Sequence, residues 1–313
     1  MKVVSIINYK GGVGKTTITA NLGTELACRG YRVLLIDADP QCSLTFSFFN
    51  SDQWNLFEEK ELTLKTFFTS LIKPIANSKS FNDVTVNPSK INKKIQEQGG
   101  KGSLHLIASH LDLINIDMRL AGILAGGIDR HEQASRYFNC FSSISQGLEK
   151  LKSQYDFVLI DCPPNFNIVT KTSIAASNYI LIPSRPDHLS TLGISYLKKS
   201  VREFVEEYNF YTKQANIPVI DPEIIGVVFT MVKVHAERPI NAHQRFMDNV
   251  VKEQKIKIFD AFIRENQTTF STASENAIPV VLSSASPPNI VQELKELVDE
   301  FECWINETDR KYY

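Results

Sequence analysis

The residues with the clearest chemical potential lie near the beginning of the chain, in the segment Asn8-Tyr9-Lys10-Gly11-Gly12-Val13-Gly14-Lys15-Thr16-Thr17. Its glycines can adopt backbone angles closed to other residues, so successive backbone N–H groups can converge on phosphate oxygens. Lys15 can neutralise β- and γ-phosphates, and the Thr16 hydroxyl can ligate the Mg²⁺ that bridges them. The segment predicts nucleoside triphosphate chemistry.

The flanking sequence predicts the elements that position this loop. Residues 3–7 are the apolar run Val-Val-Ser-Ile-Ile, typical of a buried strand, and Ile18 to Arg29 predict a helix that Gly30 ends. A helix N-terminus directed at the phosphates adds the positive end of its dipole. Strand, glycine loop and helix together would form a phosphate cradle.

Two lysines flank the glycines, and Tyr9 stands where the ordinary P-loop pattern has a glycine. Lys10 to Thr17 resembles the deviant Walker A motif of the ParA/Soj and MinD superfamily, Lys-Gly-Gly-x-Gly-Lys-Thr-Thr. The resemblance implies that Lys10 reaches across a dimer interface to the partner's nucleotide, and that Val13 and Thr17 join the glycines around the nucleotide. The alternative is a glycine-rich turn with incidental lysines.

A pair of carboxylates follows the next predicted strand, which ends at Asp37. Carboxylates at the C-terminal end of a parallel strand lie beside the phosphate site in doubly wound sheets. Asp37-Ala38-Asp39-Pro40-Gln41 resembles the family's Asp-x-Asp-Pro-Gln segment, which implies that Asp39 orients the attacking water. The alternative is a strand-end turn with a helix N-cap.

Later segments complete the expected site. Phe157 to Asp161 is an apolar strand ending in an aspartate, as in a Walker B motif, whose carboxylate holds Mg²⁺ through a coordinated water. The following Cys-Pro-Pro-Asn resembles the family's switch II and implies a nucleotide contact for Pro164. Met231 stands where the family lines the adenine pocket.

Two further stretches compare less simply with the family. Pro186 to Gly193 resembles Pro-Glu-x-Leu-Ser-x-x-Gly, and His188 within it is assigned no role. Residues 263–266 read Ile-Arg-Glu-Asn where relatives have Ile-Pro-Arg-Asn, so the adenine contacts of this loop stay unassigned.

Alternating strands and helices predict one α/β domain over residues 1–313, a doubly wound, mainly parallel sheet with helices on both faces, of the P-loop NTPase type with a deviant Walker A motif. A divergent subregion at about 51–102 interrupts the pattern with prolines, asparagines and glycines. We expect a solvated decoration there; an inserted helical subregion or a partner surface is the alternative. Single helices are expected over residues 130–153, 192–208 and 289–306.

The net charge of −1 argues against a chain coated in nucleic acid, so any DNA contact must come from a small surface. Residues 231–257 carry six basic and three acidic side chains. On a helix, Lys233, Arg238, Arg245 and Lys252 could hold DNA phosphates without reading sequence. The alternative is an ordinary solvated face of mixed charge.

Other features narrow the class of protein. The five cysteines show no C-x-x-C spacing, so neither a zinc site nor a disulfide framework is indicated. No apolar run approaches the roughly 18 residues of a membrane span, and the acidic face of the last predicted helix would be repelled by anionic lipid. Without a signal peptide we expect a cytoplasmic protein, associated with the nucleoid where it binds DNA. Without an N-terminal helix-turn-helix extension we expect no operator binding.

The resemblance implies a partition ATPase that acts in plasmid or chromosome segregation. ATP and Mg²⁺ would close a homodimer that sandwiches both nucleotides and binds DNA nonspecifically, and a ParB-like partner would accelerate slow hydrolysis. The alternative is a ParA-like positioning ATPase for a non-DNA protein cargo. A reductase resembling the nitrogenase iron protein would need cysteines bridging a cluster, and Cys140 and Cys162 lack the glycine-rich surroundings of such ligands.

Overall fold

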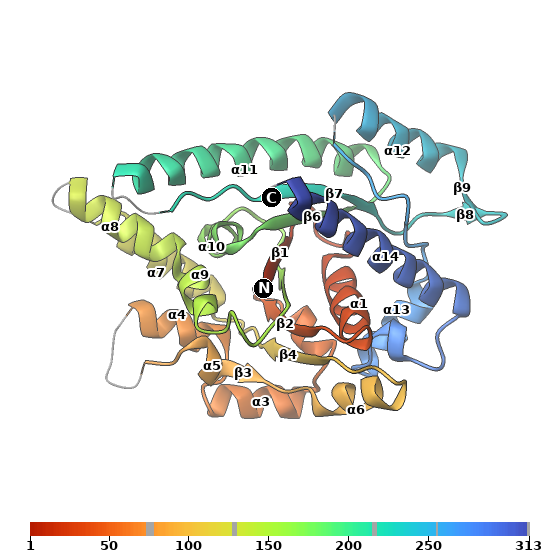
Figure 1. The fold of residues 1–313 in the computed structure, drawn as a ribbon, viewed down its shortest axis with the longest axis horizontal. Coiled ribbons are helices and arrows are strands. Elements are labelled where there is room, and N and C mark those ends of the chain that lie inside the picture. The colour runs from red at the N-terminus through yellow and green to blue at the C-terminus, as the bar shows by residue number, and fades with distance from the viewer. Residues whose placement is uncertain (73–77, 127–129, 215–217, 255, 312–313) are drawn as a thin grey trace.

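The protein is built around one seven-stranded sheet, shown in Figure 1. The computed structural model describes residues 1–72, 78–126, 130–214, 218–254 and 256–311. The strand order is β3-β4-β2-β5-β1-β6-β7. Within the described chain six of these strands, from β4 to β7 in this order, run parallel to one another, and β3 pairs antiparallel with β4 at one edge. This mainly parallel sheet confirms the predicted fold class.

The strands of this sheet are β1 (Lys2–Ile6), β2 (Arg32–Asp37), β3 (Thr85–Val86), β4 (Ser103–Ile107), β5 (Phe157–Asp161), β6 (Tyr179–Ser184) and β7 (Glu223–Phe229). β1 lies between β5 and β6, with Val4 opposite Leu159 on one side and Tyr179 on the other. β2 lies on the far side of β5, with Asp37 opposite Asp161. The register therefore brings the carboxyl ends of β1, β2 and β5 to one edge of the sheet.

Both faces of the sheet are buried. Val3 and Ile7 point into one hydrophobic core, and Val4 and Ile6 point into the other. Because alternate residues of a strand face opposite sides, a strand covered on both faces must be apolar at nearly every position. This burial explains the continuous apolar run at residues 3–7.

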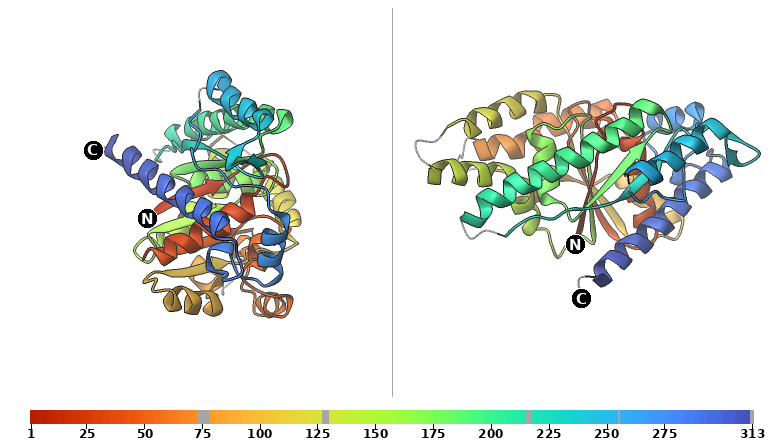
Figure 2. Two further views of the ribbon diagram at one scale, coloured as in Figure 1. Left: turned by 90° about the vertical axis from the view of Figure 1, so that its right-hand side faces the viewer. Right: turned by 90° about the horizontal axis from the view of Figure 1, so that it is seen from above.

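Helices cover each face, as Figures 1 and 2 show. The helices that pack into the first core are α4 (Leu64–Ile72), α5 (Phe81–Val84), α7 (Leu113–Leu124), α8 (Arg130–Phe141), α9 (Ser143–Glu149), α10 (Ile168–Ala176), α11 (His188–Gln214) and α12 (Asn241–Gln254). The second core receives α1 (Lys15–Cys28), α2 (Ser43–Phe46), α6 (Ser89–Glu97), η1 (Val280–Leu282) and α14 (Pro288–Lys311), with partly buried side chains from α3 (Ser51–Glu59) and α13 (Gln267–Glu275).

Several helix boundaries differ from those expected. The single helix predicted over 130–153 is two helices, α8 and α9, separated at Ser142. The helix predicted over 192–208 begins four residues earlier and ends six later, as α11. The last helix, α14, extends beyond both ends of the predicted range 289–306. Tertiary packing, which the local pattern does not reveal, decides where such helices end.

The expectation of a solvated decoration at 51–102 is wrong for the described part of that stretch. It supplies three longer helices, the short helix α5 and strand β3. Phe68 and Phe81 are fully buried in the first core, and Ile91 and Ile95 in the second. Pro88 precedes α6, and Gly99, Gly100 and Gly102 lie between α6 and β4, so these residues bound a short helix that the pattern alone did not distinguish from a loop.

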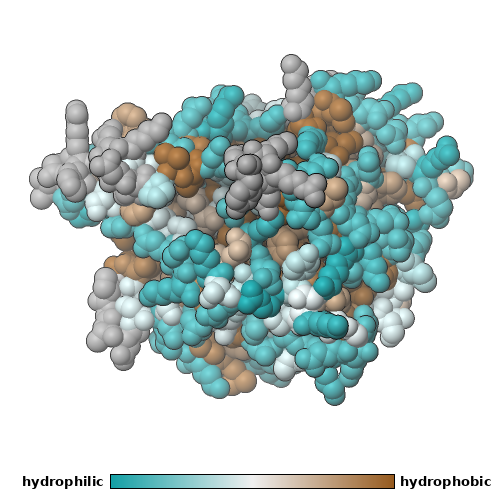
Figure 3. Space-filling model, in the orientation of Figure 1, coloured by the Kyte–Doolittle hydropathy of each residue, from teal (hydrophilic) through white to brown (hydrophobic). Residues whose placement is uncertain are grey.

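The C-terminal helix α14 packs on the body as predicted, with Leu294, Leu297 and Phe301 buried. Its outer face is acidic, and the area over α14 in Figure 3 is mainly hydrophilic. Among the described residues, none of the helices has the length and apolarity needed to cross a bilayer.

Candidate active site

The loop between β1 and α1 forms a cradle closed by positive-φ glycines. Gly12 has φ 67° and Gly14 has φ 80°, and Gly14 is the N-cap of α1. The positive φ of Gly14 favours glycine, and a Cβ there would also lie only 3.2 Å from Cγ2 of Thr230, a tight contact. The Thr230 hydroxyl donates to the Val13 carbonyl at 2.8 Å, which joins the loop to the end of β7.

The loop faces a cavity of about 440 Å³. Nine residues expected at the site line it, namely Gly11, Gly12, Gly14, Lys15, Thr16, Thr17, Asp39, Pro164 and Met231. Val13 instead points into the interior, fully buried. The side chain of Lys10 does not line this cavity and extends to Asp187 and Ser190. The structure thus brings together residues from four separate segments of the chain.

Lys15 is a buried cation at the floor of the site. It is 6% exposed, and its Nζ donates to the carbonyl of Lys10 at 3.3 Å. Burial lowers the pKa of Lys15, and the nearby carboxylates of Asp161 and Asp39 oppose this effect. A bound polyphosphate would supply the further negative charge that keeps this lysine protonated.

Asp161 has one carboxylate oxygen without a hydrogen-bond partner in the described chain, and its other oxygen contacts Thr16. The Thr16 hydroxyl donates to Oδ2 at 2.6 Å, whereas Oδ1 is buried without a hydrogen-bond partner in the described chain. Burial raises the pKa of Asp161 to about 7, although the Thr16 hydrogen bond and Lys15 act in the opposite direction. A hydroxyl and an unpaired carboxylate oxygen side by side fit the oxygen-ligand preference of Mg²⁺, held directly by Thr16 and through water by Asp161.

Asp39 is half-buried in the cavity wall, and its backbone is held on several sides. Its N–H donates to Oδ1 of Asp37 at 3.2 Å, and its carbonyl accepts from the Ser109 hydroxyl at 2.6 Å. One of its own carboxylate oxygens accepts from the N–H of Gln41 at 3.0 Å. Its carboxylate therefore stands at the edge of the phosphate site in a fixed orientation.

The supports of Asp39 were not predicted. Asp37 is completely buried and accepts from both the N–H and the hydroxyl of Thr45, and burial raises its pKa well above the usual range. The Thr45 hydroxyl also accepts from the N–H of Ser109. The indole of Trp54, on α3, donates to the Ser109 carbonyl at 3.1 Å. The subregion at 51–102 thereby helps to position the site, which no local pattern signals.

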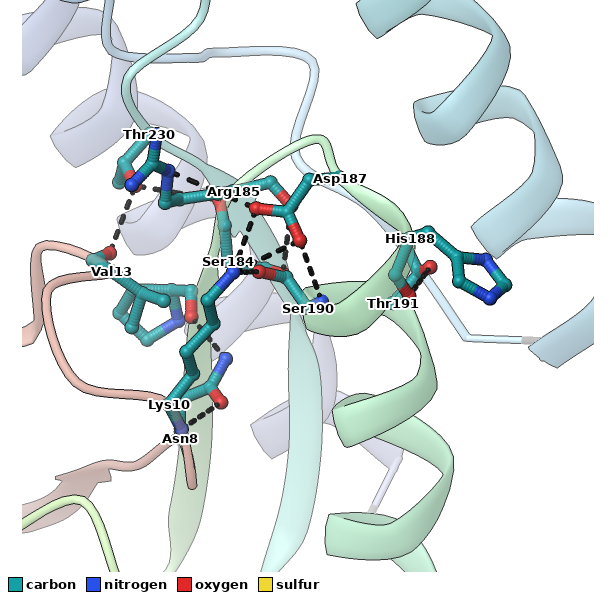
Figure 4. Close-up of polar contacts among 11 residues, drawn as sticks. Asn8, Lys10, Val13, Ser184, Arg185, Asp187, His188, Ser190, Thr191 and Thr230 are labelled. Atoms are coloured by element: carbon teal, nitrogen blue, oxygen red, sulfur yellow. Dashed lines mark hydrogen bonds and ion pairs between the residues drawn. The ribbon is translucent and has the colours of Figure 1, made fainter.

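Lys10 lies against its own chain. Its Nζ donates to both oxygens of Asp187, at 3.0 and 2.9 Å, and to the Ser190 hydroxyl at 3.0 Å. Figure 4 shows the lysine extended from the loop toward these two residues. Burial favours a higher pKa for Asp187, but the hydrogen bonds from Lys10 and Ser190 outweigh it, so its pKa lies below the usual value.

Asp187 precedes α11 and receives the N–H of Ser190 at 2.9 Å, so the lysine is held at the N-terminal end of that helix. Asn8 fixes the other end of the lysine's segment, since its amide donates to the Pro183 carbonyl and its oxygen accepts from the Lys10 N–H. The stretch containing Asp187 and Ser190 was singled out by family resemblance, but their contact with Lys10 was not foreseen.

A second cavity of about 610 Å³ adjoins the first and shares Gly14, Thr17 and Met231 with it. The loop that departs from the family pattern, including Arg264 and Asn266, lines this cavity. A nucleotide with its phosphates on the loop has room here for its base and sugar. Met231, which lines both cavities, has a positive φ of 54°.

The basic stretch is not one helix. Lys233 and Arg238 lie on a hairpin made of β8 (Val234–His235) and β9 (Arg238–Pro239), whereas Arg245 and Lys252 lie on α12. All four side chains are exposed. The expectation of a helix before Asn241 is wrong, because two residues with positive φ, Ala236 and Glu237, turn the chain back on itself.

Metal and cluster ligands of other kinds are not assembled in the described residues, where no group of three or more His, Cys, Asp or Glu could hold a metal ion. Cys140 and Cys162 are both buried. A cluster shared between subunits would need cysteines at the surface, so these two do not fit a bridging site.

The comparisons with known proteins agree with this geometry. A family model described as an AAA domain matches residues 1–214. The chromosome partitioning protein ParA of Caulobacter vibrioides is 29% identical over 286 residues, covering 90% of this chain and 87% of that protein. The sporulation initiation inhibitor protein Soj of Bacillus subtilis is 28% identical over 284 residues, with 90% of each chain covered.

A solved structure with the same fold is a McdA variant from Cyanothece in complex with ATP, with a TM-score of 0.67, 21% identity, and coverage of 96% of this chain and 95% of that one. The phosphate loop, the buried Thr16–Asp161 pair and the family match all lead to one assignment. The chain belongs to the ParA/MinD family of P-loop ATPases.

Proposed function

We propose that this ATPase is a dimerising partition switch that binds DNA nonspecifically and acts in plasmid or chromosome segregation with a ParB-like partner. The chain would work as one ATPase domain. The observation that carries the proposal is the phosphate cradle, in which Lys15, Thr16 and Asp39 line one cavity while a second lysine, Lys10, is held outside it.

In this proposal the residues of the cavity divide the work of hydrolysis. Asp39, fixed by Ser109 and Gln41, orients the attacking water. Lys15 stabilises charge on the transferred phosphoryl, and the N–H groups of the glycine loop bind its oxygens. Thr16 and Asp161 would hold Mg²⁺, which neutralises charge on the β- and γ-phosphates when bound. Pro164 and Met231 also line the cavity.

Dimerisation would depend on release of Lys10. To reach a partner's nucleotide, its Nζ must leave Asp187 and Ser190, and a partner's triphosphate is a stronger competitor for a cation than one carboxylate. Exposed apolar side chains flank the site at the start of two helices: Leu111, Ile114 and Met118 at α7, and Leu189, Leu192 and Tyr196 on α11. Exposed apolar side chains on these two helices support a subunit interface on the face of the molecule that holds the nucleotide site.

DNA binding is assigned to the hairpin and α12, through Lys233, Arg238, Arg245 and Lys252. Contacts of exposed lysine and arginine with phosphates carry no sequence information. The dimer would double this small basic surface, which offsets the modest charge of one chain. The protein would then act in the cytoplasm, on the nucleoid, and a ParB-like partner would trigger hydrolysis to end each cycle.

The test is binding to nonspecific duplex DNA at two salt concentrations, with ATP, with ADP and without nucleotide. We expect salt-sensitive binding only with ATP, lost in Lys10→Ala and weakened in the Lys233→Ala/Arg245→Ala double variant. Lys101→Ala is a matched control, because Lys101 is an exposed lysine in the loop before β4. This loop lies at the amino ends of the parallel strands, whereas the phosphate loop lies at their carboxyl ends.

A different result would redirect the proposal. If ATP produces a dimer and no nucleotide state binds DNA, the switch serves a protein cargo. The exposed apolar side chains around the site would then be the first surface to examine for that cargo. Normal Mg-ATP affinity in Lys15→Ala would overturn the ATPase site itself.

A further inference from the structure

The turn of the β8–β9 hairpin is held in a conformation that its residues do not favour. Ala236 has φ 48° and Glu237 has φ 59°. Two-residue hairpin turns with positive φ at both positions are normally made of Asn and Gly. A turn of Ala and Glu persists only where surrounding contacts determine it. A contact outside the hairpin must therefore fix this turn.

That contact is Arg264. Its Nη2 donates to Oε2 of Glu237 at 2.6 Å, and its Nε donates to Oε1 of Glu293, on α14, at 2.6 Å. The N–H of Arg264 also donates to Glu293, at 3.0 Å. Arg264 is 14% exposed and Glu293 10%, whereas Glu237 is 74% exposed. A guanidinium anchored in the body thus holds the exposed turn through its carboxylate.

The same segment forms a wall of the larger cavity. Arg264 and Met231 both line it. The segment that leads into the hairpin is joined to the Arg264 segment, because the Val232 N–H donates to the Ile263 carbonyl at 3.1 Å and the Val232 carbonyl accepts from the Glu265 N–H at 3.0 Å. The hairpin is thus connected to the Arg264 segment twice, through the backbone of Val232 and through Glu237. Both connections lead to residues beside the space left for the base and sugar.

We propose that the β8–β9 hairpin is a phosphate-binding arm for DNA, and that Arg264 positions it by clamping Glu237 to Glu293. The arm carries Lys233, His235 and Arg238, all exposed. Arg264 is a positioning residue, since its own charge is matched by the two glutamates. A nucleotide that fills the adjoining cavity would steady the arm at its base. This inference rests on the proposed DNA binding and specifies its regulation.

The variant Glu237→Ala distinguishes positioning of the arm by the clamp from a direct effect of the Glu237 charge on DNA binding. Removing a negative charge from a DNA-facing surface should by itself tighten binding. The clamp predicts the opposite: the freed arm binds nonspecific duplex DNA in the presence of ATP three to ten times more weakly than in the wild type. Asp248→Ala is the matched control, because Asp248 is an exposed acid on α12 outside the clamp, and its removal should tighten binding about twofold.

Two further measurements accompany this comparison. Arg238→Ala should weaken binding and lower the salt slope by about 0.9, the value for one lost phosphate contact. Amide hydrogen exchange across residues 232–240 should be slowed by ATP in the wild type, and be faster in both Glu237→Ala and Arg264→Ala with or without ATP. The size of the ATP-bound dimer, measured by light scattering, should be unchanged in Glu237→Ala.

Tighter DNA binding by Glu237→Ala than by the wild type, or unchanged hydrogen exchange in both clamp variants, overturns the inference and leaves the proposed function standing. Failure of the wild type to bind DNA in any nucleotide state overturns the proposed function, and the DNA-binding role of the arm with it. These outcomes are distinguishable because the first requires a wild-type protein that binds.

Discussion

The phosphate loop and the β8–β9 hairpin are two short turns, and both contact distant parts of the chain. They differ in what determines their backbone conformation. In the loop, positive φ falls on Gly12 and Gly14, which accept it without strain. In the hairpin it falls on Ala236 and Glu237, and the Arg264 clamp holds the turn. The loop thus owes its conformation to its own residue types, whereas the hairpin owes its conformation to contacts from elsewhere in the chain.

The basic side chains of the two turns also differ, in how far they are exposed to solvent. Lys15 is buried, with the carboxylates of Asp161 and Asp39 nearby. Lys233 and Arg238 are exposed. We therefore expect substitutions in the loop to have large effects on one activity, and substitutions on the hairpin and α12 to have small effects that depend on salt.

The largest effect is expected for Lys15→Ala. Loss of the buried cation leaves the β- and γ-phosphates facing Asp39 and Asp161 without compensation, so Mg-ATP affinity should fall by at least a thousandfold, about 4 kcal/mol. Isothermal titration calorimetry measures this loss, and Lys101→Ala should bind as the wild type does. Thermal unfolding checks that Lys15→Ala remains folded.

The stability of the protein without nucleotide should depend on pH through Asp161. The pKa of Asp161 rises from 3.8 in the unfolded chain to about 7 in the folded protein. Folding therefore takes up a proton between these values, and the free energy of unfolding without nucleotide should fall as pH rises from about 4 to about 7, by up to about 4 kcal/mol. Urea denaturation at several pH values measures it. Asp161→Asn should show a smaller fall, and an equal fall in both proteins would contradict this account.

A smaller effect is expected when Lys10 is released. Asp187→Asn keeps a side chain that can cap α11 and removes the charge that holds Lys10. The side chains of Lys10 and Asp187 are 35% and 38% exposed, so loss of their ion pair should change the free energy of unfolding by less than about 1 kcal/mol. ATP-dependent dimerisation, followed by analytical ultracentrifugation, should strengthen severalfold. Weaker dimerisation would show that Asp187 has a role in the dimer itself.

The smallest effect is expected on α12. Arg245→Ala should weaken binding to nonspecific DNA in the presence of ATP about threefold and lower the salt slope by about 0.9. Fluorescence anisotropy at two salt concentrations separates these quantities. A loss of binding as large as that in Lys10→Ala would mean that Arg245 acts on the switch and is not an ordinary phosphate contact.

Much of the site could be predicted from the sequence, because its chemistry is local. Residues 10–17 contain the glycines, the lysine and the threonine of the cradle in one run. Asp39 follows one apolar strand and Asp161 ends another, and parallel strands bring their carboxyl ends to one edge, where Asp37 and Asp161 are opposite each other. The sheet followed from the same alternation of strands and helices.

Other features could not be predicted because their partners are distant in sequence. Three hydrogen bonds illustrate this: the Trp54 indole donates to the Ser109 carbonyl, Lys10 donates to Asp187, and the Thr230 hydroxyl donates to the Val13 carbonyl. The hydrophobic pattern of 51–102 gave no sign that Phe68 and Phe81 reach the core, because its helices are too short to show a clear period.

The sequence by itself determined the fold class and the phosphate cradle, since apolar strands, glycine conformations and a helix N-terminus follow from residue types and spacing. Only the tertiary structure decided where the two lysines point. Lys15 lies at the floor of the cavity, because α1 begins there, and Lys10 lies on Asp187, because α11 begins beside β6 at the same edge of the sheet. A side chain's direction depends on charges brought near it by folding, and these lie up to 177 residues away.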